Sequence, residues 1–82
     1  MKSSTALKLV AKMRAGLPVK LRKSRVGGIS SPTWCMICNV LFDEGINSVK
    51  YLYREGYDNS IIAYYYDAEE NETVLSNNII LY

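Results

Sequence analysis

Two strand-like runs joined by a turn fill residues 47–67, NSVKYLYREGYDNSIIAYYYD, and this stretch indicates an antiparallel sheet. The runs 47–54 and 60–67 are rich in β-branched and aromatic residues, and Glu, Gly, Asp and Asn lie between them. A third run, Thr73 to Tyr82, follows a second turn cluster at 68–71. We therefore predict a meander of three strands.

Side chains of these strands should alternate between two faces of the sheet. On the first strand, one face should carry Val49, Tyr51 and Tyr53, and the other Lys50, Leu52 and Arg54. On the second, Ile62, Tyr64 and Tyr66 should oppose Ile61, Ala63 and Tyr65. The third strand is expected to break at Ser76-Asn77-Asn78, which leaves Ile79, Ile80 and Leu81 to close the core.

Upstream of the meander, residues 33–42 (TWCMICNVLF) are apolar on both alternating sets. The β-leaning composition and the following Asp43-Glu44-Gly45 turn favour a strand buried on both faces. A helix is the competing interpretation of this run. A strand buried on both faces needs an element to cover its second face.

An amphipathic helix over residues 4–15 can supply that cover. Ser3-Ser4-Thr5 offers helix caps, and an apolar stripe recurs at helical spacing until Gly16 and Pro18 stop the pattern. The stripe consists of Ala6, Leu9, Val10, Met13 and Leu17. Lys8 and Lys12 lie opposite it on a helical wheel, so the helix should pack by one face and present a basic ridge on the other.

The pattern then changes to a period of two. Val19 and Leu21 alternate with Lys20 and Arg22, which predicts a short strand with a basic outer edge. Residues 25–32 (RVGGISSP) indicate a flexible loop because paired glycines and a Ser-Pro step interrupt both helix and strand.

The fold class that we predict is α+β in a single domain, residues 1–82. The N-terminal amphipathic helix (4–15) packs on a small antiparallel sheet or barrel of four to five strands, and residues 17–82 are mainly β. The order Gly16-Leu17-Pro18-Val19, Pro32-Thr33-Trp34, Asp43-Glu44-Gly45 and Ser48-Val49-Lys50-Tyr51 resembles a small SH3-like or Tudor-type barrel over residues 16–82. The resemblance implies a binding module that reads nucleic acid or a peptide, without catalysis.

The charges are segregated along the sequence. The first 25 residues carry no acid and eight bases, at Lys2, Lys8, Lys12, Arg14, Lys20, Arg22, Lys23 and Arg25. All eight acids fall between Asp43 and Glu72, so the formal net charge of +2 is the sum of about +8 and about −6. We expect two surfaces of opposite sign, each with its own partner.

Catalysis and cofactors are not expected. The chain has no histidine, and its carboxylates cluster in turns, where ordinary pKa values are the default. Cys35 and Cys38 form a CxxC, but zinc would need further ligands, and a redox pair favours a helix start. The favoured interpretation is two small buried hydrophobic residues in a reducing compartment. No run of about 18 apolar residues is present, so we expect a cytoplasmic protein without a membrane span.

The first functional hypothesis is a regulatory nucleic-acid-binding protein. Its basic N-terminal face would neutralise phosphates with Lys8, Lys12, Lys20, Arg22, Lys23 and Arg25. RNA is favoured over duplex DNA because seven tyrosines can stack on unpaired bases.

The alternative is a protein-binding inhibitor that blocks a host nuclease or other nucleic-acid enzyme, in the manner of small phage or mobile-element proteins. It would use an acidic, tyrosine-rich sheet face with Tyr64, Tyr66, Glu69 and Glu70. A homodimer is a further expected partner, because a chain of 82 residues buries only a small core.

Overall fold

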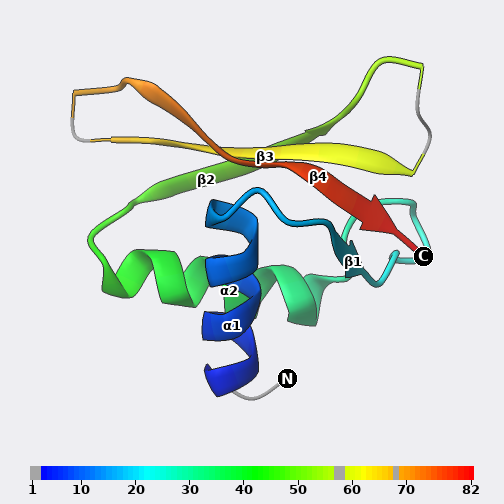
Figure 1. Ribbon diagram of the computed structural model, residues 1–82, viewed down its shortest axis with the longest axis horizontal. Helices are drawn as coiled ribbons and strands as arrows, with labels where there is room; N and C mark the ends of the chain where they lie inside the picture. The colour runs from blue at the N-terminus through cyan, green and yellow to red at the C-terminus, as the bar shows by residue number, and fades with distance from the viewer. Residues whose placement is uncertain (1–2, 57–58, 68) are drawn as a thin grey trace.

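A helical layer covers one face of a β-sheet in the computed structural model (Figure 1), which describes residues 3–56, 59–67 and 69–82. The elements in chain order are α1 (Ser3–Arg14), β1 (Val19–Leu21), α2 (Ser31–Asp43), β2 (Ser48–Tyr53), β3 (Ser60–Tyr66) and β4 (Glu72–Leu81). This confirms an α+β arrangement with an N-terminal helix. Lys2 and the predicted turn residues Tyr57, Asp58 and Ala68 lie outside the described residues. Within the described ranges, no helix is long and apolar enough to cross a membrane.

The strand order of the sheet is β1-β4-β3-β2. The meander is confirmed, because β2 pairs antiparallel with β3, and β3 pairs antiparallel with β4. β1 pairs parallel with β4, Lys20 opposite Ile80, so the sheet is mixed and the prediction of an entirely antiparallel sheet was wrong at this edge. Antiparallel neighbours can be joined by a tight turn, but parallel strands need a long connection. β1 and β4 are joined through α2, β2 and β3, which allows them to run parallel.

β4 runs through the predicted break but is bulged there. Ile61 pairs with Ile79 and Ala63 with Ser76, so β4 holds one more residue than β3 between these pairs. A second extra residue, Leu75, falls between Ser76 and Val74. As a result, Leu75 and Ser76 are both buried although they are neighbours in sequence. Beyond the bulges, side chains of β4 again alternate between the two faces of the sheet, and Ile79 and Leu81 face the core.

Residues 33–42 are helical, so the favoured prediction of a strand was wrong and the competing helix was right. Ser31-Pro32 opens α2, with proline in the first turn where its missing N–H is not needed. Gly45, at φ +89°, ends it, and the Gly45 N–H donates to the Phe42 carbonyl at 2.9 Å. Because α2 is buried at Ile37 and Leu41, one turn apart, while Phe42 is half exposed, the run is packed on one side only.

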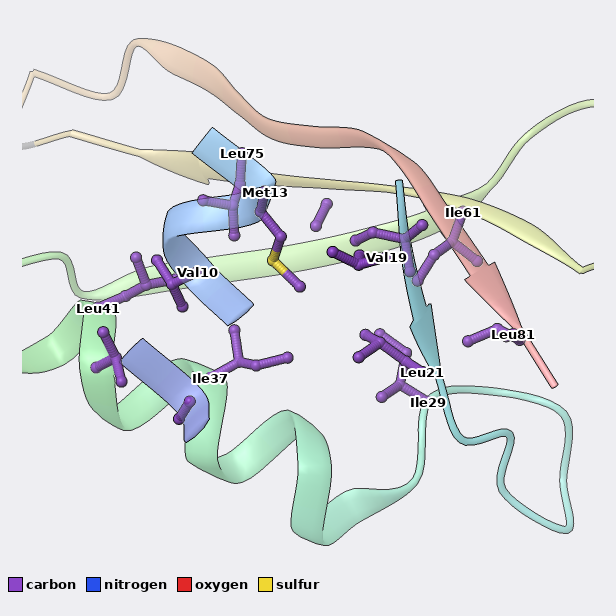
Figure 2. Close-up of a cluster of buried hydrophobic side chains, with 14 residues drawn as sticks. Val10, Met13, Val19, Leu21, Ile29, Ile37, Leu41, Ile61, Leu75 and Leu81 are labelled. Atoms are coloured by element: carbon purple, nitrogen blue, oxygen red, sulfur yellow. The ribbon is translucent and has the colours of Figure 1, made fainter. Parts of the chain in front are cut away.

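The core lies between the helices and the sheet, and Figure 2 shows both layers contributing to it. α1 contributes Val10 and Met13, while Leu21 and Ile61 come from the sheet. The stripe predicted for α1 is confirmed at Ala6, Val10 and Met13, whereas Leu17 lies beyond the helix and is half exposed. Residues 17–82 hold all four strands and also α2, which supplies part of the helical side of the core.

Candidate nucleic-acid interface

Residues 22–30 form a small hydrogen-bonded hairpin at one end of the sheet, which we call the basic hairpin. Its strands are held by the Ser30 N–H donating to the Arg22 carbonyl at 2.8 Å and the Ser24 N–H donating to the Gly28 carbonyl at 2.6 Å. Arg25 and Val26 form its tip. The predicted loop is thus a defined turn, and Pro32 belongs to α2.

The side chains of Arg22, Lys23 and Arg25 are exposed on this hairpin. Lys23 ties it to its neighbours, because its N–H donates to the Tyr82 carbonyl and its ammonium donates to Asn59 Oδ1, both at 2.9 Å. At the other strand of the hairpin, the Ile29 N–H donates to the hydroxyl of Tyr51, a β2 residue, at 3.2 Å. The hairpin cations are therefore carried on a backbone that is fixed on both sides.

α2 begins directly after the hairpin, so its N-terminus lies at the same end of the molecule (Figure 1). No side chain caps this terminus, because the Ser30 hydroxyl is hydrogen-bonded to Thr33 Oγ1 at 2.9 Å instead of to a backbone N–H. The first turn carries no acidic residue. The positive end of the helix dipole therefore adds to the charge of the hairpin and is not offset locally.

Two exposed tyrosines accompany the hairpin, and the sequence argument did not single them out. Tyr53 is 42% exposed, and its hydroxyl lies 3.6 Å from the position of a Cβ on Gly27. Tyr82 is 71% exposed and follows β4, next to Lys23 in the backbone hydrogen bonding. The parallel pairing of β1 with β4 brings Tyr82 to the hairpin, and no feature of the sequence predicted this pairing.

The remaining predicted phosphate ligands lie elsewhere. Lys20 is exposed on β1 opposite Ile80, on the face of the sheet that the helices do not cover. Lys8 and Lys12 are exposed on α1, which lies beneath the middle of the sheet in Figure 1, whereas the hairpin lies at one end. The structure thus divides the six predicted cations into the hairpin group, Lys20 and the α1 pair.

The opposite end of the molecule is acidic. The acids described there are Asp43, Glu44, Asp67, Glu69, Glu70 and Glu72. α2 ends among them with Asp43 and has no base in its last turn, so its negative end faces like charges. Of these acids, Glu44 is paired with Arg14, across the two helices.

A cleft of about 530 Å³ opens at this acidic end between the start of β2 and the β3–β4 turn. Its lining includes Ser48, Tyr66, Asp67 and Glu70. Hydrogen bonds from the Asn71 backbone N–H and then the Glu69 backbone N–H lower the pKa of Asp67, so this carboxylate stays charged at neutral pH.

Tyr64 and Tyr66 lie on the uncovered sheet face, as the alternation of β3 predicted. Their rings meet edge to face with centroids 5.7 Å apart, and the Lys50 ammonium lies 5.7 Å from the Tyr66 centroid. Glu72 accepts a hydrogen bond from the Tyr66 hydroxyl at 3.3 Å. The predicted protein-interface residues Tyr64, Tyr66, Glu69 and Glu70 thus lie on this face and on the adjoining β3–β4 turn.

The two cysteines lie on α2 and differ in exposure. Cys38 is buried, but Cys35 is exposed, so the prediction of two buried residues was wrong for Cys35. Burial, and then the neighbouring Cys35, raises the pKa of Cys38. Within the described residues, no group of three or more Cys, Asp or Glu side chains is arranged to hold a metal ion.

Comparison of the chain with protein-family models, with curated proteins and with solved structures finds no match. The resemblance to SH3-like barrels stays a prediction, and the long strand that it places after Pro32 is the helix α2.

Proposed function

We propose that the protein binds single-stranded nucleic acid, with RNA preferred over duplex DNA, through the basic hairpin. The observation that carries the proposal is the joint placement of Arg22, Lys23 and Arg25 with the uncapped positive end of α2. Phosphates are the natural ligands of such a surface, since arginine forks and helix N-termini both favour anions. The role is one of binding in the cytoplasm, with no catalytic step.

The electrostatics of α2 support a binding role over a purely structural one. Bases before the first turn of a helix and acids at its end oppose the helix dipole, so this placement lowers stability. A polyanion at the hairpin would reverse the unfavourable interaction at the N-terminal end. The preference for RNA rests on Tyr53 and Tyr82, whose exposed rings can stack on unpaired bases.

The test is fluorescence anisotropy with a single-stranded RNA and a duplex DNA of the same length. Three phosphate contacts on a single strand predict that raising salt from about 50 to about 200 mM weakens RNA binding roughly 20-fold. The variant R22E/R25E should lose at least about tenfold in RNA affinity at low salt. Tyr82→Ala should weaken RNA binding about tenfold but leave duplex DNA binding unchanged, and Tyr82→Phe should restore it.

The matched control is K8E/K12E, which makes the same change in net charge on α1. We expect it to lower RNA affinity by about threefold at most, because its cations act only at long range. Equal losses in both double variants would show a diffuse charge effect and contradict a site at the hairpin. Absence of RNA binding by the wild-type chain at low salt would overturn the proposal.

The acidic cleft favours a second candidate, a protein partner with a basic surface. Asp67 and Glu70 line the cleft beside the Tyr66 ring, a combination that suits an arginine side chain. A nucleic-acid enzyme of the host is the class of partner that this chemistry fits. Binding to such an enzyme should be lost in E69K/E70K and retained in R22E/R25E, and the reverse pattern would contradict this candidate.

A further inference from the structure

One face of the sheet carries an apolar surface that no element of the chain covers. Both helices lie on the other face in Figure 1. The cross-strand pairs Leu52–Ile62 and Tyr64–Val74 place these side chains on the uncovered side, because opposite residues of neighbouring strands share a face. We call this surface the open face; it consists of Leu52, Ile62, Tyr64, Tyr66, Val74 and Ile80.

Several large apolar side chains of the open face are exposed to solvent. Val74 is 55% exposed, Leu52 46% and Ile80 41%. They lie on β2 and β4, on either side of β3, and the bulged segment 76–78 separates Val74 from Ile80 on β4. Several exposed apolar side chains gathered on one face of a small protein mark an interaction site.

Charges of opposite sign border the two ends of the open face. Lys20 lies beside Ile80 at the hairpin end, because these residues are paired across β1 and β4. Glu72 lies opposite Tyr66 at the other end, with Glu69 and Glu70 in the adjoining turn. Along β1 and β4, the face is therefore basic at Lys20, then apolar, then acidic at Glu72, while Lys50 on β2 shares the face opposite Tyr64.

We infer that the open face binds a second copy of this chain, in a face-to-face dimer whose strands run antiparallel across the interface. A two-fold axis within the interface and perpendicular to the strands places each Lys20 end over the Glu72 end of the partner and stacks the two apolar centres. An axis along the strands would instead place like charges together, which opposes that arrangement. Charge complementarity thus favours a second copy as the occupant and fixes its orientation.

The inference is independent of the proposed nucleic-acid binding. Arg22, Lys23 and Arg25 lie on the hairpin beyond the open face, so the dimer leaves one basic hairpin at each of its ends. Lys50 lies on the edge strand β2, on the same face as Leu52, with its ammonium over the Tyr66 ring of its own chain. The face is roughly 15 by 20 Å by ordinary strand dimensions, which is small for a stable interface. We therefore expect a reversible dimer with a dissociation constant on the order of 10 µM.

Sedimentation equilibrium over a concentration series tests the dimer. The wild type should pass from monomer to dimer between about 1 µM and about 1 mM, following that dissociation constant. Val74→Lys and Leu52→Lys should each raise the dissociation constant at least about tenfold with an unchanged thermal midpoint, because both side chains are exposed in the monomer. Leu7→Lys is the matched control: Leu7 is 56% exposed on α1, away from the open face, and its replacement should leave the dimer intact.

Charge reversal tests the orientation. K20E and E72K should each raise the dissociation constant by about three- to tenfold, and K20E/E72K should recover most of the loss, because each reversed residue again meets an opposite charge. Additive losses in the double variant would overturn the antiparallel arrangement. A monomer at every concentration, or equal dimerisation by the wild type and Val74→Lys, would overturn the dimer itself. R22E/R25E should dimerise normally even though its RNA affinity is at least about tenfold lower, which separates the two proposals.

Discussion

The hydroxyl of Tyr51 occupies the space that a side chain at Gly28 would need. A Cβ built on Gly28 overlaps that oxygen, whereas the nearest ring carbons are 3.5 and 3.8 Å away, at ordinary contact distance. The same hydroxyl accepts the hydrogen bond from the Ile29 N–H. Trp34 packs edge to face on the Tyr51 ring at 4.9 Å, which limits how far the ring can move. One tyrosine thus fixes the hairpin to both layers of the fold.

Gly28→Ala should destabilise the protein by about 1–3 kcal/mol, because the hydroxyl must move and the Ile29 N–H loses its acceptor. Tyr51→Phe alone should cost about 1 kcal/mol for the lost hydrogen bond. The double variant G28A/Y51F should be more stable than the sum of the single effects predicts, since the overlapping oxygen is gone. Urea denaturation followed by Trp34 fluorescence measures all three. Strict additivity would contradict this packing.

The Arg14–Glu44 pair predicts a pH dependence of stability. The hydrogen bond from Arg14, and to a lesser extent its charge, lowers the pKa of Glu44 below the ordinary value of 4.5. The folded chain then binds fewer protons than the unfolded chain in this range, so the stabilisation is complete above pH 4.5 and is lost as the pH falls through the lowered pKa. Glu44→Gln should flatten the fall of the thermal midpoint between about pH 5 and about pH 3. Parallel curves for the wild type and Glu44→Gln would contradict this prediction.

The two thiols should differ in reactivity. Cys35 is exposed, while the Cys38 thiol is buried and has a raised pKa, so little reactive thiolate forms there near pH 8. A maleimide should modify one thiol per folded chain rapidly and the second only on unfolding. Cys35→Ser should abolish the rapid reaction, and Cys38→Ser should leave it unchanged. Mass spectrometry of the labelled protein distinguishes these results from equal labelling of both residues.

Glu70 adopts a backbone conformation that suits glycine, with φ at +62° in the β3–β4 turn. Glu70→Gly should therefore raise the stability by up to about 1 kcal/mol, because a Cβ is strained in the left-handed region. Glu69→Gly is the matched control and should lower the stability, since glycine loses more backbone entropy on folding than glutamate does. The thermal midpoints of the two variants provide the comparison. Equal changes in both would contradict the assignment of strain to Glu70.

The alternation of side chains predicted the β2–β3–β4 meander and its two faces, because period two has few competing explanations. Helical spacing likewise predicted α1 through Ala6, Val10 and Met13. Periodicity gave the wrong prediction for residues 33–42, since an apolar run without a polar side fits a buried strand and a packed helix equally well. The helix-boundary signals, Pro32 in the first turn and Gly45 after the last one, were the better guide.

The candidate site was only partly predictable for a different reason. Charge segregation identified Arg22, Lys23 and Arg25 from local sequence alone. Lys20 was also predicted from local sequence, but the position of Tyr82 beside the hairpin needed the parallel pairing of β1 with β4, a non-local contact that leaves no turn signal in the sequence. The same pairing separated Lys20 from the hairpin cations and placed it on the open face.

That pairing also sets the order in which the chain can assemble during translation. Val19 pairs with Ile79, 60 positions later (79 − 19), so β1 has no partner in the sheet until β4 has been made. At about 5–20 residues per second, synthesis of the residues between the two strands takes roughly 3–12 s, during which β1 is unpaired. During that interval the Tyr82 carbonyl that accepts the Lys23 N–H does not yet exist, so the hairpin reaches its anchored form only after β4 has been made.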